Sequence, residues 1–285
     1  KDALPGNLAN IYAAVGELKK AIECLDKAIE LNPKNPNFYN SQGHIFLQRE
    51  ELGRASTSFK KALEIEPDNP TNNYNVANTY RKMGKLKNAI TYFEGVDIGI
   101  SQSHLAECLY LDGQYEKLRE KLTELNGRDV TDPLIGALTE HTRITLNKKG
   151  PNAFCLQPLS HIYRANIDLS GSTGRTLQTI KDFAYSKEQE YKTQAQQALL
   201  INGVQSPGNL LNSNQFFVEP LREILRKSIA AYKKKFGNSQ EPFLKHWPRE
   251  YELYAWLVIV SNEGFLKAHI HKEGWLSGSL YLDLP

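Results

Sequence analysis

The chain contains little cysteine and has no long apolar run. Its 285 residues include three cysteines, Cys24, Cys108 and Cys155, which lie far apart in the sequence. This sparse, odd set excludes a disulfide-stapled scaffold and favours a reducing compartment, so we expect a cytoplasmic protein. No apolar stretch approaches the roughly 20 residues of a transmembrane helix, so we expect no membrane span. The chain begins at Lys1, so a signal peptide is neither visible nor excluded.

The chain also lacks a strong excess of either charge. It has 35 basic and 32 acidic residues, which gives a formal net charge of +3. This balance gives no reason to expect nucleic acid or a membrane surface as a partner. The composition, with 40% hydrophobic and 24% charged residues, is typical of a globular protein, and the length allows two domains.

The first half of the chain repeats with a period of 34 residues. Small residues, a bulky residue and a proline recur at fixed offsets: Ala21, Leu25, Ala28 and Pro33; Ala55, Phe59, Ala62 and Pro67; then Ala89 and Phe93. Small residues let two helices approach closely, and a proline prevents a helix from continuing. This period and pattern resemble the tetratricopeptide repeat (TPR), in which each unit is a pair of helices.

The pattern predicts three repeats, over residues 2–35, 36–69 and 70–98. A divergent fourth unit is expected from His104, and a further helix pair from Pro133. We therefore predict an all-α TPR superhelix over residues 1–146.

The resemblance also implies a binding face. It places polar residues at equivalent exposed positions on the first helix of each pair: Asn7 and Asn10, Ser41 and His44, and Asn75 and Asn78. The first helices line the concave face of a TPR stack, where a protein or peptide partner is expected. An asparagine amide has donors and an acceptor, so a ladder of them can pair with an extended peptide backbone. The alternative is a solvated polar groove without a specific ligand.

The region 147–204 is predicted to be a junction. Gly150, Pro151 and Pro158 rule out one long helix there. Cys155 has no histidine at a spacing typical of a catalytic pair, so we interpret it as a buried structural thiol. The stretch 171–175 (GSTGR) lacks the full pattern of a phosphate loop and is predicted to be an ordinary loop before a helix over 176–200.

The last segment, 205–285, is predicted to combine one helix with a meander of strands. An amphipathic helix is expected over 219–236, because apolar residues recur there at helical spacing. Strands are expected over 252–260, 264–271 and 275–284, and the first has apolar residues on both faces, as in a buried strand. His269 and His271 would then project from one face of a strand, about 7 Å apart.

The sequence HIHKEGWLSGSLYLDLP at the C-terminal end, with QSPGNLL and FLKHWP upstream, resembles a family of 2-oxoglutarate/Fe(II) oxygenase domains found fused behind TPR repeats in bacteria. The matching residues are His269, His271, Gly274, Trp275, Ser277, Tyr281 and Pro285. The resemblance implies an α+β chain: the TPR superhelix followed by a partial double-stranded β-helix, or jelly roll, with covering helices. The chain would then be a hydroxylase-type dioxygenase whose TPR region recruits a protein or peptide.

The same resemblance implies the cofactors. Fe(II) would be held by His269 and His271, or by His271 and Glu273, and 2-oxoglutarate would lie near Ser277 and Tyr281. The family's third ligand and its arginine come on later strands, so we expect the natural chain to continue and these 285 residues to show no turnover. The alternatives are a zinc site at the two histidines, a polar patch in the sheet, and a non-catalytic TPR interaction module.

Overall fold

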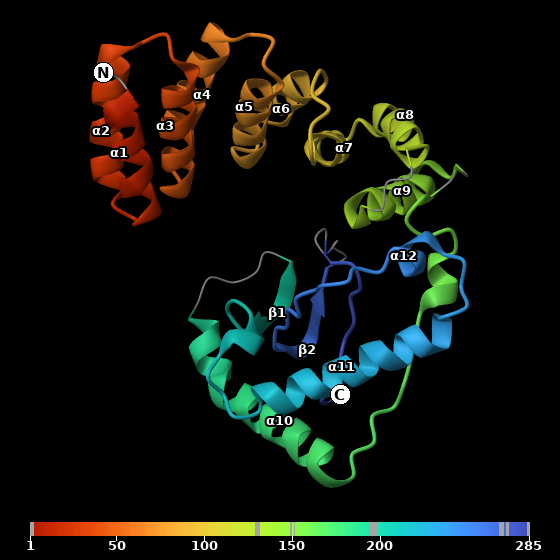
Figure 1. The fold of residues 1–285 in the computed structure, drawn as a ribbon. Helices are drawn as coiled ribbons and strands as arrows, with labels where there is room; N and C mark the ends of the chain where they lie inside the picture. Colours follow the sequence, from red (N-terminus) through yellow and green to blue (C-terminus); the bar gives the residue numbers. More distant parts are fainter. Residues whose placement is uncertain are drawn as a thin grey trace. The chain divides into compact units, whose positions relative to one another are not determined.

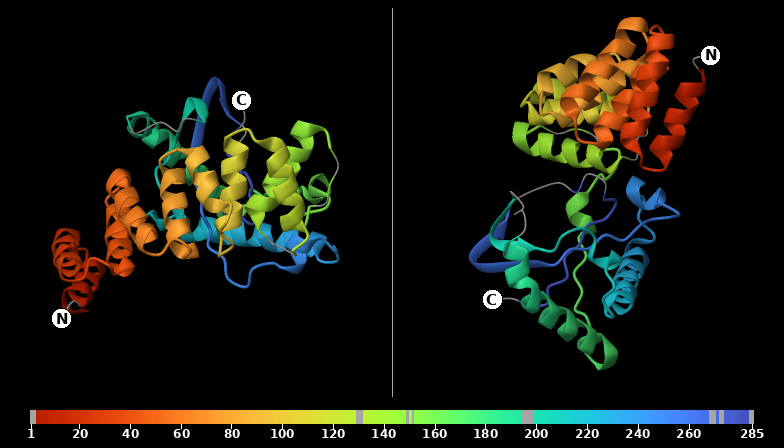
Figure 2. Two further views of the ribbon diagram at one scale, coloured as in Figure 1. Left: turned by 90° about the horizontal axis from the view of Figure 1, so that it is seen from above. Right: turned by 90° about the vertical axis from the view of Figure 1, so that its left-hand side faces the viewer.

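The computed structural model describes residues 3–128, 132–148, 150, 152–193, 199–267, 271 and 274–283. The chain divides into two compact units. Unit 1 consists of Lys1–Arg128 and Leu138–Gly150, and unit 2 of Asp129–Ala137 and Pro151–Pro285. Figures 1 and 2 show that the described elements of unit 1 are helices and that the strands belong to unit 2. The predicted division at 1–146, 147–204 and 205–285 stays a prediction.

Unit 1 is a succession of antiparallel helix pairs. Its helices are α1 (Ala3–Ala14), α2 (Leu18–Leu31), α3 (Pro36–Gln48), α4 (Leu52–Ile65), α5 (Pro70–Lys82), α6 (Leu86–Phe93), α7 (Ser101–Leu111), α8 (Tyr115–Asn126) and α9 (Pro133–Leu146), whose first residues belong to unit 2. The prediction of repeated TPR-like helices is therefore confirmed. The expected partner of α9 is not found in the described residues 147–170, which contain only the short 3₁₀ helix η1 (Pro158–His161).

The repeat boundaries follow from capping chemistry. Asn35 precedes α3, and its side chain accepts a hydrogen bond from the backbone N–H of Asn37 at 3.1 Å. Asn69 does the same before α5, where it accepts from Thr71 at 2.9 Å. In both places a proline occupies the first helical turn, where its missing N–H removes no intrahelical bond. The asparagine–proline pair therefore starts the first helix of two successive repeats.

The repeated small and bulky residues form the core of unit 1. Ala55, Ala89, Phe59 and Phe93 are fully buried. A Cβ atom on Gly43 of α3 would lie 2.6 Å from the ring of Phe59 on α4, so only glycine leaves room for that ring. The pairing of helices within a repeat thus depends on the residues that define the 34-residue period.

The first helices of the repeats form one row. Helix α1 contacts α3, α3 contacts α5, and α5 contacts α7, while the second helices α2, α4 and α6 pack on α3, α5 and α7 (Figure 1). Successive second helices make no comparable contact within the described residues. The first helices are therefore closer together and form the inner layer of unit 1.

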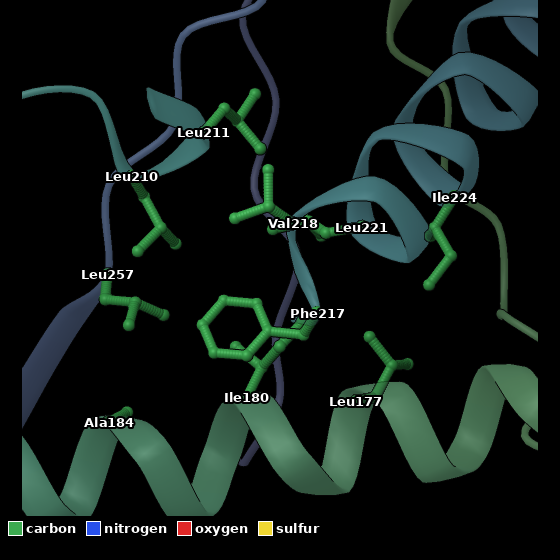
Figure 3. Close-up of a cluster of buried hydrophobic side chains, with 10 residues drawn as sticks. All are labelled: Leu177, Ile180, Ala184, Leu210, Leu211, Phe217, Val218, Leu221, Ile224 and Leu257. Carbon is green, nitrogen blue, oxygen red and sulfur yellow. The ribbon is translucent and has the colours of Figure 1, made fainter. Parts of the chain in front are cut away.

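Unit 2 has a core between two helices and a small sheet. Its elements are η1, α10 (Gly171–Lys192), β1 (Leu200–Gln205), η2 (Leu210–Asn212), α11 (Val218–Phe236), α12 (Pro242–Lys245) and β2 (Val258–Leu266). Figure 3 shows the apolar side chains of α10 and α11 meeting those of η2 and Leu257. The amphipathic helix predicted over 219–236 is confirmed as α11.

The sheet differs from the predicted meander. In the described residues it consists of two antiparallel strands, β1 and β2, with Val204 opposite Ile259, and no jelly roll is present. The prediction of a strand over 275–284 is wrong for the described residues 275–283, which contain no strand. Residues 258–266 form one strand, which joins the end of the strand expected over 252–260 to the start of the strand expected over 264–271.

Side-chain hydrogen bonds explain why 251–257 is not a strand. The Asn209 amide donates to Leu253 O at 2.9 Å and accepts from the Ala255 N–H at 3.0 Å, so it takes the place of a neighbouring strand. The predicted burial of both faces is also wrong. Leu257 is buried in the core, whereas Trp256 and Val260 are 39% and 45% exposed.

Two predictions for the junction also need correction. The stretch 171–175 is the first turn of α10 rather than a loop, and α10 ends at Lys192 instead of near residue 200. The Asp168 carboxylate accepts hydrogen bonds from the backbone and hydroxyl of Ser170, which fixes the chain just before the helix. None of the described helices is both long enough and apolar enough to cross a membrane.

Candidate functional site

The candidate site lies on the row of first helices in unit 1. Asn10 on α1, His44 on α3 and Asn78 on α5 occupy the same position in successive repeats, 34 residues apart. Asn10 and His44 are exposed, and Asn78 is half-buried. Asn7, one helical turn before Asn10, is also exposed. We call Asn10, His44 and Asn78 the polar row.

Asn75 does not share this exposure, so the prediction of an exposed side chain there is wrong. It is buried, and its amide donates to the Asn40 side-chain oxygen at 3.1 Å. The amide of Asn40 in turn donates to Asn72 at 2.8 Å, and the Asn72 amide donates to the carbonyl of Ala62 at 3.2 Å. This chain of amides ties α5 to α3 and α4. Asn75 therefore positions the neighbouring helices.

Asn78 is held by an ion pair. Its side-chain oxygen accepts from two nitrogens of Arg81, at 3.0 and 3.2 Å. Arg81 also donates to Glu107 of α7 at 2.8 Å, and their side chains are only 18% and 10% exposed. Because the Asn78 oxygen is used inside the unit, the amide offers a ligand its N–H donors. The nearby positive charge of Arg81 is already neutralised.

His44 adds a neutral group to the polar row. Its ring meets Phe59 edge-on, with centroids 5.0 Å apart. Although His44 is exposed on one side, desolvation of the ring where it packs against the protein lowers the pKa of the imidazole below its usual value, so the neutral ring predominates at neutral pH. A neutral imidazole offers one donor and one acceptor.

Tyrosine–histidine pairs extend the same layer along later helices. Tyr74 of α5 stacks on His104 of α7, with centroids 6.1 Å apart. The Tyr110 hydroxyl lies 3.3 Å from Nε2 of His141 on α9. The inner layer therefore continues beyond the polar row with tyrosine and histidine side chains.

The C-terminal histidine motif is described only in part. His269, Glu273 and Pro285 lie outside the described residues. His271 is exposed, and its ring centroid lies 5.6 Å from that of Trp256. Since a facial iron site needs three protein donors, the described donors around His271 do not make one.

The other residues of the motif have separate surroundings. The Trp275 indole donates to the carbonyl of Phe243 at 3.1 Å, and its ring meets that of Phe154 at 5.2 Å. Ser277 is exposed, and Tyr281 is 71% exposed. The role of Ser277 and Tyr281 toward 2-oxoglutarate stays a prediction.

Sequence reasoning missed a different group of donors in unit 2. Cys155, His161 and Glu241 bring a thiol, an imidazole nitrogen and a carboxylate oxygen within 4.8 Å of one another. Cys155 is buried, as predicted, but the prediction that it lacks a suitable histidine is wrong. The local signal was Pro158, which starts the turn η1 and brings His161 back toward the cysteine.

Comparison with known families identifies the repeats. The family described as TPR repeat matches residues 9–48 and 43–84. Residues 9–84 therefore match tetratricopeptide repeats. We call residues 9–84 the TPR region. No curated protein sequence matches the chain.

Several solved structures resemble part of the chain. YrrB, described as a TPR protein with an unusual peptide-binding site, is 21% identical, with a TM-score of 0.46 over 52% of this chain and 79% of its own. The first TPR of Spaghetti (RPAP3), bound to the HSP90 peptide SRMEEVD, is 16% identical, with a TM-score of 0.38 over 40% and 94%. MamA from Desulfovibrio magneticus RS-1 is 18% identical, with a TM-score of 0.46 over 51% and 85%.

Proposed function

We propose that the TPR region is a protein-interaction module that holds an extended segment of its partner across α1, α3 and α5. The observation that supports this most is the polar row: Asn10, His44 and Asn78 repeat at one position on three neighbouring helices. Each can donate or accept a hydrogen bond, as a peptide backbone requires.

The spacing of the helices suits an extended chain. Packed helices lie about 8–10 Å apart, and an extended chain advances about 3.3 Å per residue. The polar row would therefore meet the partner about once every three residues. Three helices would cover a segment of about nine residues.

The charge state of the side chains at the polar row favours contacts with uncharged groups of the partner. Arg81 is paired with Glu107, and the lowered pKa of His44 keeps its ring neutral. Recognition would then depend on main-chain amides and side-chain shape in the partner, with little dependence on salt. This distinguishes the proposal from binding through surface charge.

The test compares two asparagine substitutions. Asn78→Ala removes a member of the polar row, while Asn88→Ala changes an exposed asparagine of the second helix α6. A nine-residue peptide selected from a random library would be titrated against each variant by fluorescence anisotropy. Loss of one hydrogen bond costs about 0.5–1.5 kcal/mol, so Asn78→Ala should weaken binding up to about tenfold.

The control variant Asn88→Ala should bind like the original chain. Circular dichroism would confirm that Asn78→Ala stays folded after losing its bond to Arg81. Equal binding by the two variants, or a library that yields no peptide, would contradict the proposal in favour of a solvated face.

A second candidate concerns unit 2, and it rests on the sequence motif around His271 and Trp275. Under this proposal unit 2 belongs to a 2-oxoglutarate/Fe(II)-dependent hydroxylase in the cytoplasm, and the TPR region recruits its protein substrate. The test is anaerobic Fe(II) titration by calorimetry in the presence of 2-oxoglutarate. His271→Ala should weaken iron binding, and unchanged binding would favour the non-catalytic module.

A further inference from the structure

The donors Cys155, His161 and Glu241 come from separate parts of unit 2. Cys155 lies in the loop before η1, His161 ends η1, and Glu241 directly precedes α12. Their donor atoms lie within 4.8 Å of one another. Thiolate, imidazole and carboxylate are the three donor types that zinc uses in proteins. Because tetrahedral zinc ligands lie about 3.3–3.8 Å apart, the donor–donor distances would shorten by at most about 1.5 Å around an ion.

The loop that holds Cys155 is fixed by a buried asparagine. The Asn152 side-chain oxygen accepts from the backbone N–H of Phe154 at 3.1 Å and of Cys155 at 3.2 Å. Its amide donates to the carbonyl of Gly136 at 3.0 Å. Asn152 is 3% exposed, so these bonds are shielded from water. These hydrogen bonds therefore fix the backbone at Cys155, which carries the thiol.

The imidazole of His161 is oriented for a ligand at Nε2. Nδ1 lies 2.9 Å from the carbonyl oxygen of Gln157, which can only accept, so Nδ1 must hold the proton. In the neutral ring, Nε2 then has a lone pair, which now faces the Ser239 hydroxyl at 3.0 Å. Metal-binding histidines are commonly held in this way, with the other nitrogen donating to a backbone carbonyl.

Glu241 is a buried acidic residue whose side-chain oxygens face backbone donors. It is 6% exposed and accepts from the backbone N–H groups of Leu156 at 2.5 Å and Gln157 at 3.1 Å. Within the described part of the chain, no lysine or arginine forms an ion pair with it. Each oxygen retains a lone pair, so a cation could bind without breaking these bonds. A divalent ion would offset the cost of burying the charge.

Aromatic rings surround the group. The rings of Phe236 and Phe243 lie 5.0 and 5.6 Å from the His161 ring, and the cluster around Cys155 also includes Tyr232 and Trp275. An apolar shell restricts water and strengthens the attraction between an ion and its charged ligands.

We propose that Cys155, His161 and Glu241 form a zinc site, with the fourth position open to a water molecule or the Ser239 hydroxyl. Three protein ligands plus an open position is the arrangement of zinc that binds a small ligand, whereas a purely structural zinc has four protein ligands. Zinc binding would displace the proton of the Cys155 thiol, so affinity should fall as the pH is lowered.

The first test uses Co²⁺ as a spectroscopic probe. The full chain, stripped of metal with a chelator, would be titrated with CoCl₂ alone. A thiolate ligand gives a cobalt charge-transfer absorption in the near ultraviolet, which added Zn²⁺ should remove. Cys155→Ser should abolish this absorption, whereas Cys24→Ser, in unit 1, should leave it unchanged. Glu241→Gln should weaken Co²⁺ binding at least tenfold.

A second test needs no variant. Mass spectrometry would follow alkylation of the cysteines in the original chain with and without Zn²⁺. Zinc should slow alkylation of Cys155 at least tenfold and leave that of Cys24 unchanged. Absence of the charge-transfer absorption, its persistence in Cys155→Ser, or equal alkylation of Cys155 with and without zinc would overturn the proposal.

Discussion

Two glycine-to-alanine substitutions in one repeat should have opposite effects on stability. Gly43 lies on α3, where an added Cβ would fall 2.6 Å, 2.7 Å and 2.7 Å from three ring atoms of Phe59. Gly53 lies on the partner helix α4, is exposed, and an added Cβ there would meet nothing within 4 Å. The chemical change is the same, and only the packing differs.

The magnitudes follow from these distances. Carbon atoms in contact normally lie about 3.5–4.0 Å apart, so the added methyl group of Gly43→Ala would force the rigid, fully buried Phe59 ring to move by about 1 Å. Overpacking of this kind costs about 1–3 kcal/mol, against a gain of about 1 kcal/mol from alanine's better helix propensity. Gly43→Ala should therefore destabilise the chain by up to about 2 kcal/mol. Gly53→Ala should stabilise it by about 0.5–1 kcal/mol.

The assay is urea unfolding followed by far-ultraviolet circular dichroism, which detects the helices of unit 1. The unfolding midpoint should fall for Gly43→Ala and rise for Gly53→Ala, with similar slopes for both. A rise in the midpoint for Gly43→Ala would refute the close packing of α3 on α4. The TPR region depends on that packing, so the assignment of the first helices to the inner layer would fail as well.

Two further predictions concern buried polar groups. Asn72→Ala removes the amide that bonds Ala62 and Asn40, and should cost about 1–3 kcal/mol in urea unfolding; a cost below about 0.5 kcal/mol would contradict the amide chain. Burial, with the nearby Cys155, raises the pKa of Tyr232 to about 12, against 10.0 when unfolded. The stability this gives is complete below pH 10 and is lost as the pH rises through about 12. Tyr232→Phe should remove this loss of stability at high pH. A titration in which every tyrosine, Tyr232 included, gives phenolate absorbance near pH 10 would contradict the prediction.

The repeats could be predicted from the sequence because their packing is local. Phe59 packs against Gly43 and His44 of its own repeat, so the residues of such contacts recur every 34 residues. The exposure of a single side chain also depends on residues of neighbouring repeats. Asn75 has the same place in its repeat as Asn7, yet it is buried because Asn40 on the preceding repeat faces it.

In unit 2, the sequence predicted only an element whose structure follows from the spacing of its own apolar residues. The helix α11 was predicted from its apolar spacing. The residue pattern in 252–260 predicted a strand buried on both faces, but it did not reveal that Asn209 would replace a neighbouring strand or that Trp256 and Val260 are exposed. The group at Cys155 and Glu241 depends on the folding of distant segments, which no spacing in the sequence indicates.

The most direct test of the proposed interaction is photo-cross-linking with the selected nine-residue peptide. Benzoylphenylalanine would replace His44 on the first helix α3 or, as a control, Thr57, an exposed residue of the second helix α4. The account predicts that the peptide cross-links to position 44 and that excess unlabelled peptide prevents it, with no cross-link at position 57. Equal cross-linking at both positions, or cross-linking at position 57 alone, would contradict binding along the first helices.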